Sequence, residues 1–141
     1  MDRDDAVGRD RTRACTLGDR QLARYDDVLG RYAAAFGAST VAHIPIRDHS
    51  FVAPSTFADE MLPVLRATDD AAEPIVVHCW AGLGRTGHLL ALWLVTDRGY
   101  ELTDAVEAVR SMNRRPLEAA RGDEGDGHAA LRAVLDAVGD R

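Results

Sequence analysis

The chain has 141 residues, 46% of them hydrophobic, which is enough for one domain with a single core. The formal net charge is −6, and all 17 basic residues are arginine. Such an acidic surface disfavours nucleic acid and anionic membranes, so neither is expected as a partner.

The N-terminal part of the sequence contains no apolar segment of the kind found in secretory signal peptides. The longest apolar run, 89–95, is too short to span a membrane. Two cysteines, Cys15 and Cys79, do not make a disulfide framework. These features predict a soluble cytoplasmic protein; its oligomeric state stays open.

The N-terminal third is expected to contain an arm, two strands and a helix. Residues 1–13 are dense in Asp and Arg and lack periodicity, which predicts a disordered arm ahead of a folded domain at 14–141. Short strands are expected at 14–17 and 40–46. Between them, apolar residues recur in steps of three and four over 20–36, which predicts one amphipathic helix. Its apolar positions are Leu22, Tyr25, Leu29, Tyr32 and Phe36.

The remaining segments alternate between helix and strand. A helix is expected from Pro54 to about residue 67, followed by a buried strand at 75–77. The apolar run 89–95 predicts a buried helix that ends at Gly99. A helix starting at Thr103, a charged loop over 114–127 and a last helix over 128–138 complete the chain. Alternating strands and helices predict an α/β domain with a short, mostly parallel sheet flanked by helices.

The segment between the 75–77 strand and the buried helix reads His-Cys-Trp-Ala-Gly-Leu-Gly-Arg-Thr-Gly over 78–87. A Gly-rich loop between a strand and a helix gathers N–H groups at the positive end of the helix dipole, which predicts an anion site. The phosphate-binding backbone would run through Trp80, Ala81, Gly82, Leu83 and Gly84.

Five residues separate Cys79 from Arg85 in this loop. The helix N-terminus and the guanidinium both favour the thiolate, so the pKa of Cys79 is expected to fall from ~8.5 to roughly 3.5–7.5. Arg85 can hold two phosphate oxygens at once, and the Thr86 hydroxyl can donate to the departing thiolate. A nucleophile inside a phosphate cradle predicts covalent phosphoryl transfer to sulfur.

The pattern from His78 to Gly87 resembles the H-C-x5-R-[ST]-G signature of cysteine-based protein phosphatases, in particular dual-specificity and archaeal-type tyrosine phosphatases. The resemblance covers roughly 14–138. It implies a phosphotyrosine phosphatase II-like fold, catalysis without a metal or cofactor, and a phosphorylated protein as substrate: phosphotyrosine, with phosphoserine and phosphothreonine as further candidates. In relatives, the residue at the position of His78 orients the loop. The alternative is a structural role: a buried Cys79 before a Gly-rich turn, with Arg85 paired at the surface.

The segment 44–49, Ile-Pro-Ile-Arg-Asp-His, resembles the Pro-Ile-x-Asp segment that carries the general acid in this family. The resemblance assigns Asp48 as the acid that protonates the leaving group and then as the base that activates water. Two alternatives stay open: Asp48 as a turn former, and His49 as the acid. The other histidines share no ligand spacing and are expected in the core or on the surface: His43, His88 and His128.

The sequence also departs from the family pattern. Relatives usually have further strands and a helix before the position of Cys15, so the domain is expected to be N-terminally short and its sheet to lack an edge strand. The late glutamine that positions water has no clear counterpart. The acidic residues available there are Glu118, Asp123 and Glu124.

Two further residues have candidate roles. Trp80 is expected at the pocket rim, where it could stack on an aromatic substrate. In lipid-phosphatase relatives, a cysteine at a strand end similar to that of Cys15 forms a reversible disulfide with the nucleophile. The alternative for Cys15 is a small buried hydrophobic residue.

The sequence therefore favours a phosphomonoester hydrolase, with two alternatives. One is a catalytically weak phosphate-binding protein. The other is a phosphatase of a non-protein phosphoester; relatives of that kind often carry basic residues in the loop, where this chain has Trp80, Ala81 and Leu83.

Overall fold

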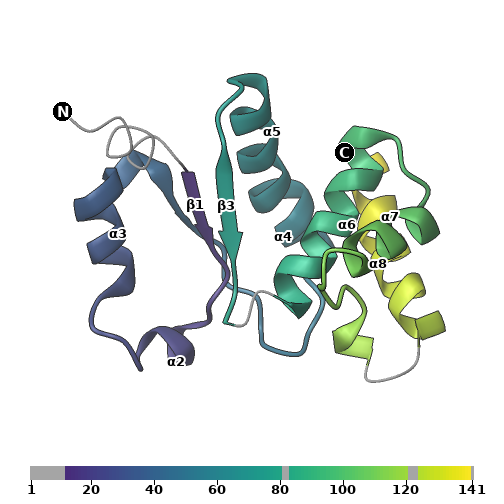
Figure 1. Cartoon of the computed structure of the whole chain (residues 1–141), viewed down its shortest axis with the longest axis horizontal. Helices are drawn as coiled ribbons and strands as arrows, with labels where there is room; N and C mark the ends of the chain where they lie inside the picture. Colours follow the sequence, from purple (N-terminus) through teal and green to yellow (C-terminus); the bar gives the residue numbers. More distant parts are fainter. Residues whose placement is uncertain (1–11, 81–82, 121–123, 141) are drawn as a thin grey trace.

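Three parallel strands form the sheet in this computed structural model, which describes residues 12–80, 83–120 and 124–140 (Figure 1). The strands are β1 (Thr12–Cys15), β2 (Val41–His43) and β3 (Ile75–His78), in the order β2-β1-β3. Cys15 is in register with His43 on one side and with His78 on the other. The carboxyl ends of all three strands therefore lie at one edge of the sheet, and β3 is an outer strand of the described sheet. The predicted α/β fold with a short parallel sheet is confirmed.

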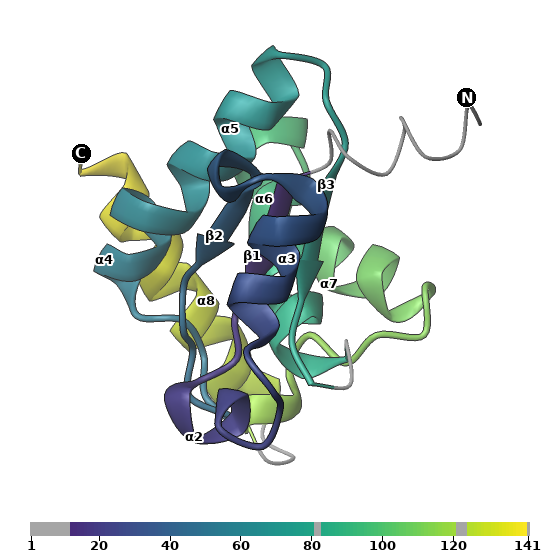
Figure 2. The ribbon, with the colours of Figure 1, turned by 90° about the vertical axis from the view of Figure 1, so that its left-hand side faces the viewer.

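The helices form two layers, one on each side of the sheet. The first contains α2 (Asp19–Leu22) and α3 (Val28–Phe36), and Figure 2 shows α3 lying across β1. The second contains α4 (Pro54–Thr56), a π-helical turn (Phe57–Met61), α5 (Leu62–Asp70), α6 (Gly84–Arg98), α7 (Leu102–Arg110) and α8 (Glu124–Gly139). Short 3₁₀ turns lie at Ala38–Thr40 and Glu118–Ala120. None of the described helices is long and apolar enough to cross a membrane.

The alternation of side chains along the strands explains these layers. Ala14 and Val77 belong to the hydrophobic core that the second layer covers, together with Leu89 and Leu92 of α6. Along each strand, the side chain next to these core residues points to the opposite face of the sheet, toward α3. The Arg13 guanidinium lies 3.9 Å from the centroid of the Phe36 ring, and the His78 ring contacts Tyr32 edge-on at 5.6 Å.

The predicted helix over 20–36 is wrong, because the segment is interrupted between α2 and α3. Asp27, at φ +50°, is the N-cap of α3, and its carboxylate accepts a hydrogen bond from the Gly30 N–H at 3.2 Å. A capping aspartate starts a new helix and stops the preceding one from continuing. Tyr25, predicted on the buried face, is instead 47% exposed.

Other element boundaries also differ from those predicted. The expected strand over 40–46 ends at His43, although the N–H groups of Ile44 and Ile46 still donate to the carbonyls of Cys15 and Thr16 at 2.9 and 3.0 Å. Because Pro45 lacks an N–H, the regular ladder stops there. Helix α8 begins at Glu124, inside the predicted loop 114–127. Of the predicted arm, residues 1–11 lie outside the described residues, and Thr12 and Arg13 begin β1.

Candidate active site

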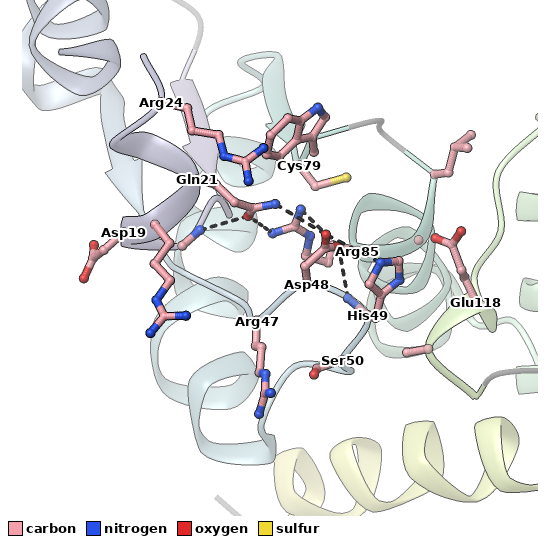
Figure 3. A pocket seen from close by; sticks show the side chains of 16 residues that line it. Asp19, Gln21, Arg24, Arg47, Asp48, His49, Ser50, Cys79, Arg85 and Glu118 are labelled. Carbon is pink, nitrogen blue, oxygen red and sulfur yellow. Dashed lines mark hydrogen bonds and ion pairs between the residues drawn. The ribbon is translucent and has the colours of Figure 1, made fainter. Parts of the chain in front are cut away.

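Cys79 follows β3 directly and lines a cavity of about 910 Å³ at the carboxyl edge of the sheet (Figure 3). The residue is 8% exposed. The Thr86 hydroxyl, in the first turn of α6, donates to the Cys79 sulfur at 3.3 Å. The carbonyl of His78 accepts hydrogen bonds from the N–H and the hydroxyl of Thr16, at 3.0 and 2.8 Å. These contacts fix the thiol between the end of a strand and the start of a helix.

Helix α6 begins earlier than expected, at Gly84, so Arg85 and Thr86 lie in its first turn and not in the preceding loop. Its N-cap, Leu83, makes no side-chain capping hydrogen bond. The first N–H groups of a helix have no partners within the helix, so an uncapped first turn beside a thiol is suited to an anion. Leu83 and Gly84 line the cavity with Trp80, whereas Ala81 and Gly82 lie outside the described residues.

The Arg85 side chain is 3% exposed and connects the ends of two strands. Its Nη1 donates to the carbonyls of Ile46 and Thr16, at 3.1 and 3.4 Å. The same nitrogen donates to Gln21 Oε1 of α2 at 2.7 Å, and Nη2 lies 3.4 Å from Asp48 Oδ1. Four neighbours thus hold the guanidinium in one orientation, which is the condition for a bidentate phosphate contact.

Asp48 lies in the loop after β2, beside the Arg85 guanidinium, with 49% of its side chain exposed. Its Oδ1 accepts a hydrogen bond from the His49 N–H at 3.0 Å, and its Oδ2 accepts one from Gln21 Nε2 at 3.5 Å. The imidazole Nε2 of His49 is 3.7 Å from Asp48 Oδ2. Both candidate acids therefore line the cavity, and Asp48 is the one in contact with Arg85.

Gln21 was not among the predicted site residues, although it contacts both Arg85 and Asp48. Gln21 and Arg85 are 64 positions apart, and no sequence motif connects them. Its only sequence signal is a polar side chain shortly after the first strand. The prediction of a single helix over 20–36 gave that position no role in the site.

His88 was likewise expected only as a core or surface residue; it is buried, at 1% exposure. Its Nε2 accepts a hydrogen bond from the Val52 N–H at 3.1 Å, so Nδ1 carries the proton and donates to the Gly84 carbonyl at 3.1 Å. Burial lowers the pKa of His88 from 6.5 to about 4. The neutral ring joins the loop that follows Asp48 to the first turn of α6.

The His78 side chain lies on the α3 face of the sheet. Burial lowers its pKa, and its Nδ1 is 3.4 Å from the Cys79 carbonyl oxygen. Its Nε2 is buried without a hydrogen-bond partner among the described residues. Cys15 is fully buried beside His78 in the register, and burial raises the pKa of its thiol. The two cysteines are not joined by a disulfide, and Cys15 ends the strand next to β3.

The segment after α7 packs closely on the start of α6. The Arg115 N–H donates to the Leu83 carbonyl at 3.1 Å. A Cβ on Gly87 would lie 3.2 Å from the Pro116 nitrogen, and one on Gly84 would collide with the Glu118 carboxylate. Glu118 therefore lies at the cavity beside the first turn of α6. Of the other two acidic candidates, Glu124 begins α8, and Asp123 lies outside the described residues.

A thiol at a strand–helix junction, with a buried arginine in the first turn of the helix, places the domain in the class of cysteine-based tyrosine and dual-specificity phosphatases. The model of a family described as "Polymorphic toxin system, DSP-PTPase phosphatase" matches residues 17–99. The chain belongs to this family.

Similar proteins carry related names. The tyrosine-protein phosphatase cdc-14 of Caenorhabditis elegans is 43% identical over 53 residues, which are 37% of this chain and 8% of that protein. The dual specificity protein phosphatase OPG106 of monkeypox virus is 28% identical over 68 residues, 48% of this chain and 40% of that protein. The matches thus span less than half the length of these curated relatives.

Solved structures share the fold. The crystal structure of Tk-PTP in its active form superposes with a TM-score of 0.72 at 24% identity, over 97% of this chain and 84% of that one. Kinase associated phosphatase, in a form with its catalytic cysteine replaced by serine, gives a TM-score of 0.78 at 16% identity, over 97% and 74% of the two chains.

Proposed function

We propose that this chain is a cysteine-dependent phosphomonoester hydrolase that removes phosphate from phosphotyrosine in proteins, with phosphoserine and phosphothreonine as further substrates to be tested. The observation that carries this proposal is the grouping of Cys79, Arg85 and Asp48 around one cavity, with the Thr86 hydroxyl hydrogen-bonded to the Cys79 sulfur. The names of the similar proteins point the same way. The expected partner is a phosphorylated protein in the cytoplasm.

In the first step, Arg85 and the N–H groups at the start of α6 hold the phosphoryl oxygens. The Cys79 thiolate attacks phosphorus; a P–S bond forms as the P–O bond to the substrate breaks. Asp48, in its protonated form, gives its proton to the departing oxygen. Its contact with Arg85 at 3.4 Å keeps the carboxyl group beside the place where the phosphoryl group would be held.

In the second step, a water molecule attacks the phosphocysteine, and the Asp48 carboxylate accepts a proton from that water. The P–S bond breaks and inorganic phosphate is released. Cys79 leaves as a thiolate, which the Thr86 hydroxyl stabilises through the hydrogen bond already present at 3.3 Å. Asp48 has regained its proton, so the site returns to its starting state.

Hydrolysis of p-nitrophenyl phosphate tests the proposal, with Cys79→Ser as the matched variant. The wild type should release product in proportion to protein concentration. The variant should lose turnover yet still bind inorganic phosphate, because a serine hydroxyl does not ionise at neutral pH. Residual activity within about tenfold of wild type would contradict the role of Cys79. Phosphate binding without turnover by the wild type would identify a phosphate-binding protein instead.

A further inference from the structure

Three exposed arginines line the cavity in addition to the buried Arg85: Arg20, Arg24 and Arg47. None of the three forms an ion pair with a described residue. Arg24 lies instead with its guanidinium 5.0 Å from the centroid of the Trp80 ring. Figure 3 shows Arg24 and Arg47 on different sides of the Arg85 guanidinium.

Most of the exposed arginines described elsewhere are paired, with Arg132 of α8 as the exception within the described ranges. Arg31, Arg66 and Arg98 contact aspartates at 2.9, 3.1 and 2.7 Å. In an Asp-rich chain of net charge −6, unpaired arginines therefore gather at the cavity mouth. The four arginines and the three carboxylates that line the cavity, Asp19, Asp48 and Glu118, leave one net positive charge there. A local positive field in an acidic protein directs anionic ligands to that place.

The same mouth carries an aromatic wall. Trp80 directly follows the nucleophile and is 46% exposed, and the Tyr25 ring lies 6.2 Å from it in a tilted arrangement, itself 47% exposed. Large exposed aromatic side chains beside a binding cavity offer stacking surface to a ring. The wall therefore favours a phosphate ester of an aromatic alcohol, and the arginines favour further negative charges around it.

Resting on the function proposed above, we propose that the preferred substrate is phosphotyrosine flanked on both sides by aspartate or glutamate in an acidic peptide segment. The phosphotyrosine ring lies along Trp80 with its phosphate on Arg85, and the flanking carboxylates pair with Arg20, Arg24 and Arg47. An exposed pair of this kind changes affinity by about two- to fivefold. Two arginines together should thus contribute roughly 4- to 25-fold.

The test compares two phosphotyrosine peptides of equal length, one with glutamates and one with glutamines on both sides. The wild type should show a higher kcat/KM for the acidic peptide, and higher ionic strength should reduce the difference. The double variant Arg20→Gln, Arg47→Gln should lose roughly 4- to 25-fold of this preference. Arg66→Gln removes the same kind of charge from a paired site on α5 and should keep the full preference.

Equal kcat/KM on the two peptides, or a preference that survives the double substitution, overturns the proposal. So does a higher kcat/KM on an inositol polyphosphate than on the acidic peptide. Charge reversal keeps the test independent of a general loss of activity: Arg20→Glu with Arg47→Glu should prefer a lysine-flanked peptide. Hydrolysis of p-nitrophenyl phosphate separates failure of the proposed function from failure of this inference. If the wild type hydrolyses this compound but shows no peptide preference, only the inference fails. If the wild type does not hydrolyse it, the proposed function itself fails.

Discussion

His88 links the loop that carries Asp48 to the helix that carries Arg85, and this link should make stability depend on pH. Its Nε2 accepts the Val52 N–H at 3.1 Å, which only an unprotonated nitrogen can do. Burial, backed by the nearby positive charge of Arg85, lowers the pKa of His88 from 6.5 to about 4. Protonation would place a proton on His88 Nε2 that faces the Val52 N–H, so this hydrogen bond would be lost and the loop released.

The size of the effect follows from linkage between protonation and folding. Between pH 6.5 and about 4, the unfolded chain protonates His88 while the folded protein does not. The contribution is therefore fully present above that window and is lost as the pH falls through it. A pKa difference of this size between the unfolded and the folded protein corresponds to about 3 kcal/mol of unfolding free energy. That is a large share of the ~5–15 kcal/mol typical of domains.

Urea unfolding of wild type and His88→Gln, at about pH 7.5 and about pH 4.5, measures this contribution. Glutamine does not titrate in this range, so the wild type should lose roughly 2 kcal/mol more than the variant on acidification. Burial lowers the pKa of His78 too, and its effect is common to both proteins. Equal losses in the two proteins would refute the reasoning.

Four further substitutions test the site. Asp48→Asn should lower kcat by roughly 10²–10⁴-fold, most for poor leaving groups such as phenol and least for p-nitrophenol; if His49→Asn shows that pattern instead, His49 is the acid. Arg85→Lys should lose most activity, because an ammonium cannot replace the bidentate fork, and a variant with wild-type kcat/KM would show that the fork is not needed. After mild peroxide and thiol reductant, Cys15→Ser should recover activity as fully as wild type. Cys15 is fully buried, on the same face of the sheet as His78, and is therefore expected not to react with Cys79. Irreversible loss of the variant alone would show that Cys15 protects Cys79 through a disulfide.

The local parts of the site could be predicted from sequence. Cys79, Arg85 and Thr86 lie within eight consecutive residues, and a strand before them and an apolar helix after them leave few ways to fold the loop. The parallel sheet was predictable for a similar reason, since β-branched runs alternate with helical periodicity. The Asp48 loop was placed correctly at a strand end, because carboxyl ends of parallel strands share one edge.

The parts that depend on contacts far apart in the sequence could not be predicted. The periodicity of 20–36 fits one helix, yet the N-cap at Asp27 starts a new helix and leaves Tyr25 exposed beside Trp80. Gln21 acquires its role only because α2 lies near the strand ends whose following carbonyl groups also contact Arg85. His88 has the polarity of a surface residue in the sequence, and only the packing of the Val52 loop against α6 gives it a partner.

The most direct test of the central claim is to detect phosphocysteine on Cys79. Asp48→Asn should slow the second step, because the base that activates water is missing, whereas p-nitrophenol leaves without an acid. Rapid quenching of this variant with p-nitrophenyl phosphate, followed by peptide mass spectrometry, should show one phosphoryl group on the peptide that contains Cys79. The group should be absent when Cys79→Ser is added. Turnover by the wild type with no phosphoryl group on Cys79 in the quenched variant, or with the group on another residue, would contradict the proposed mechanism.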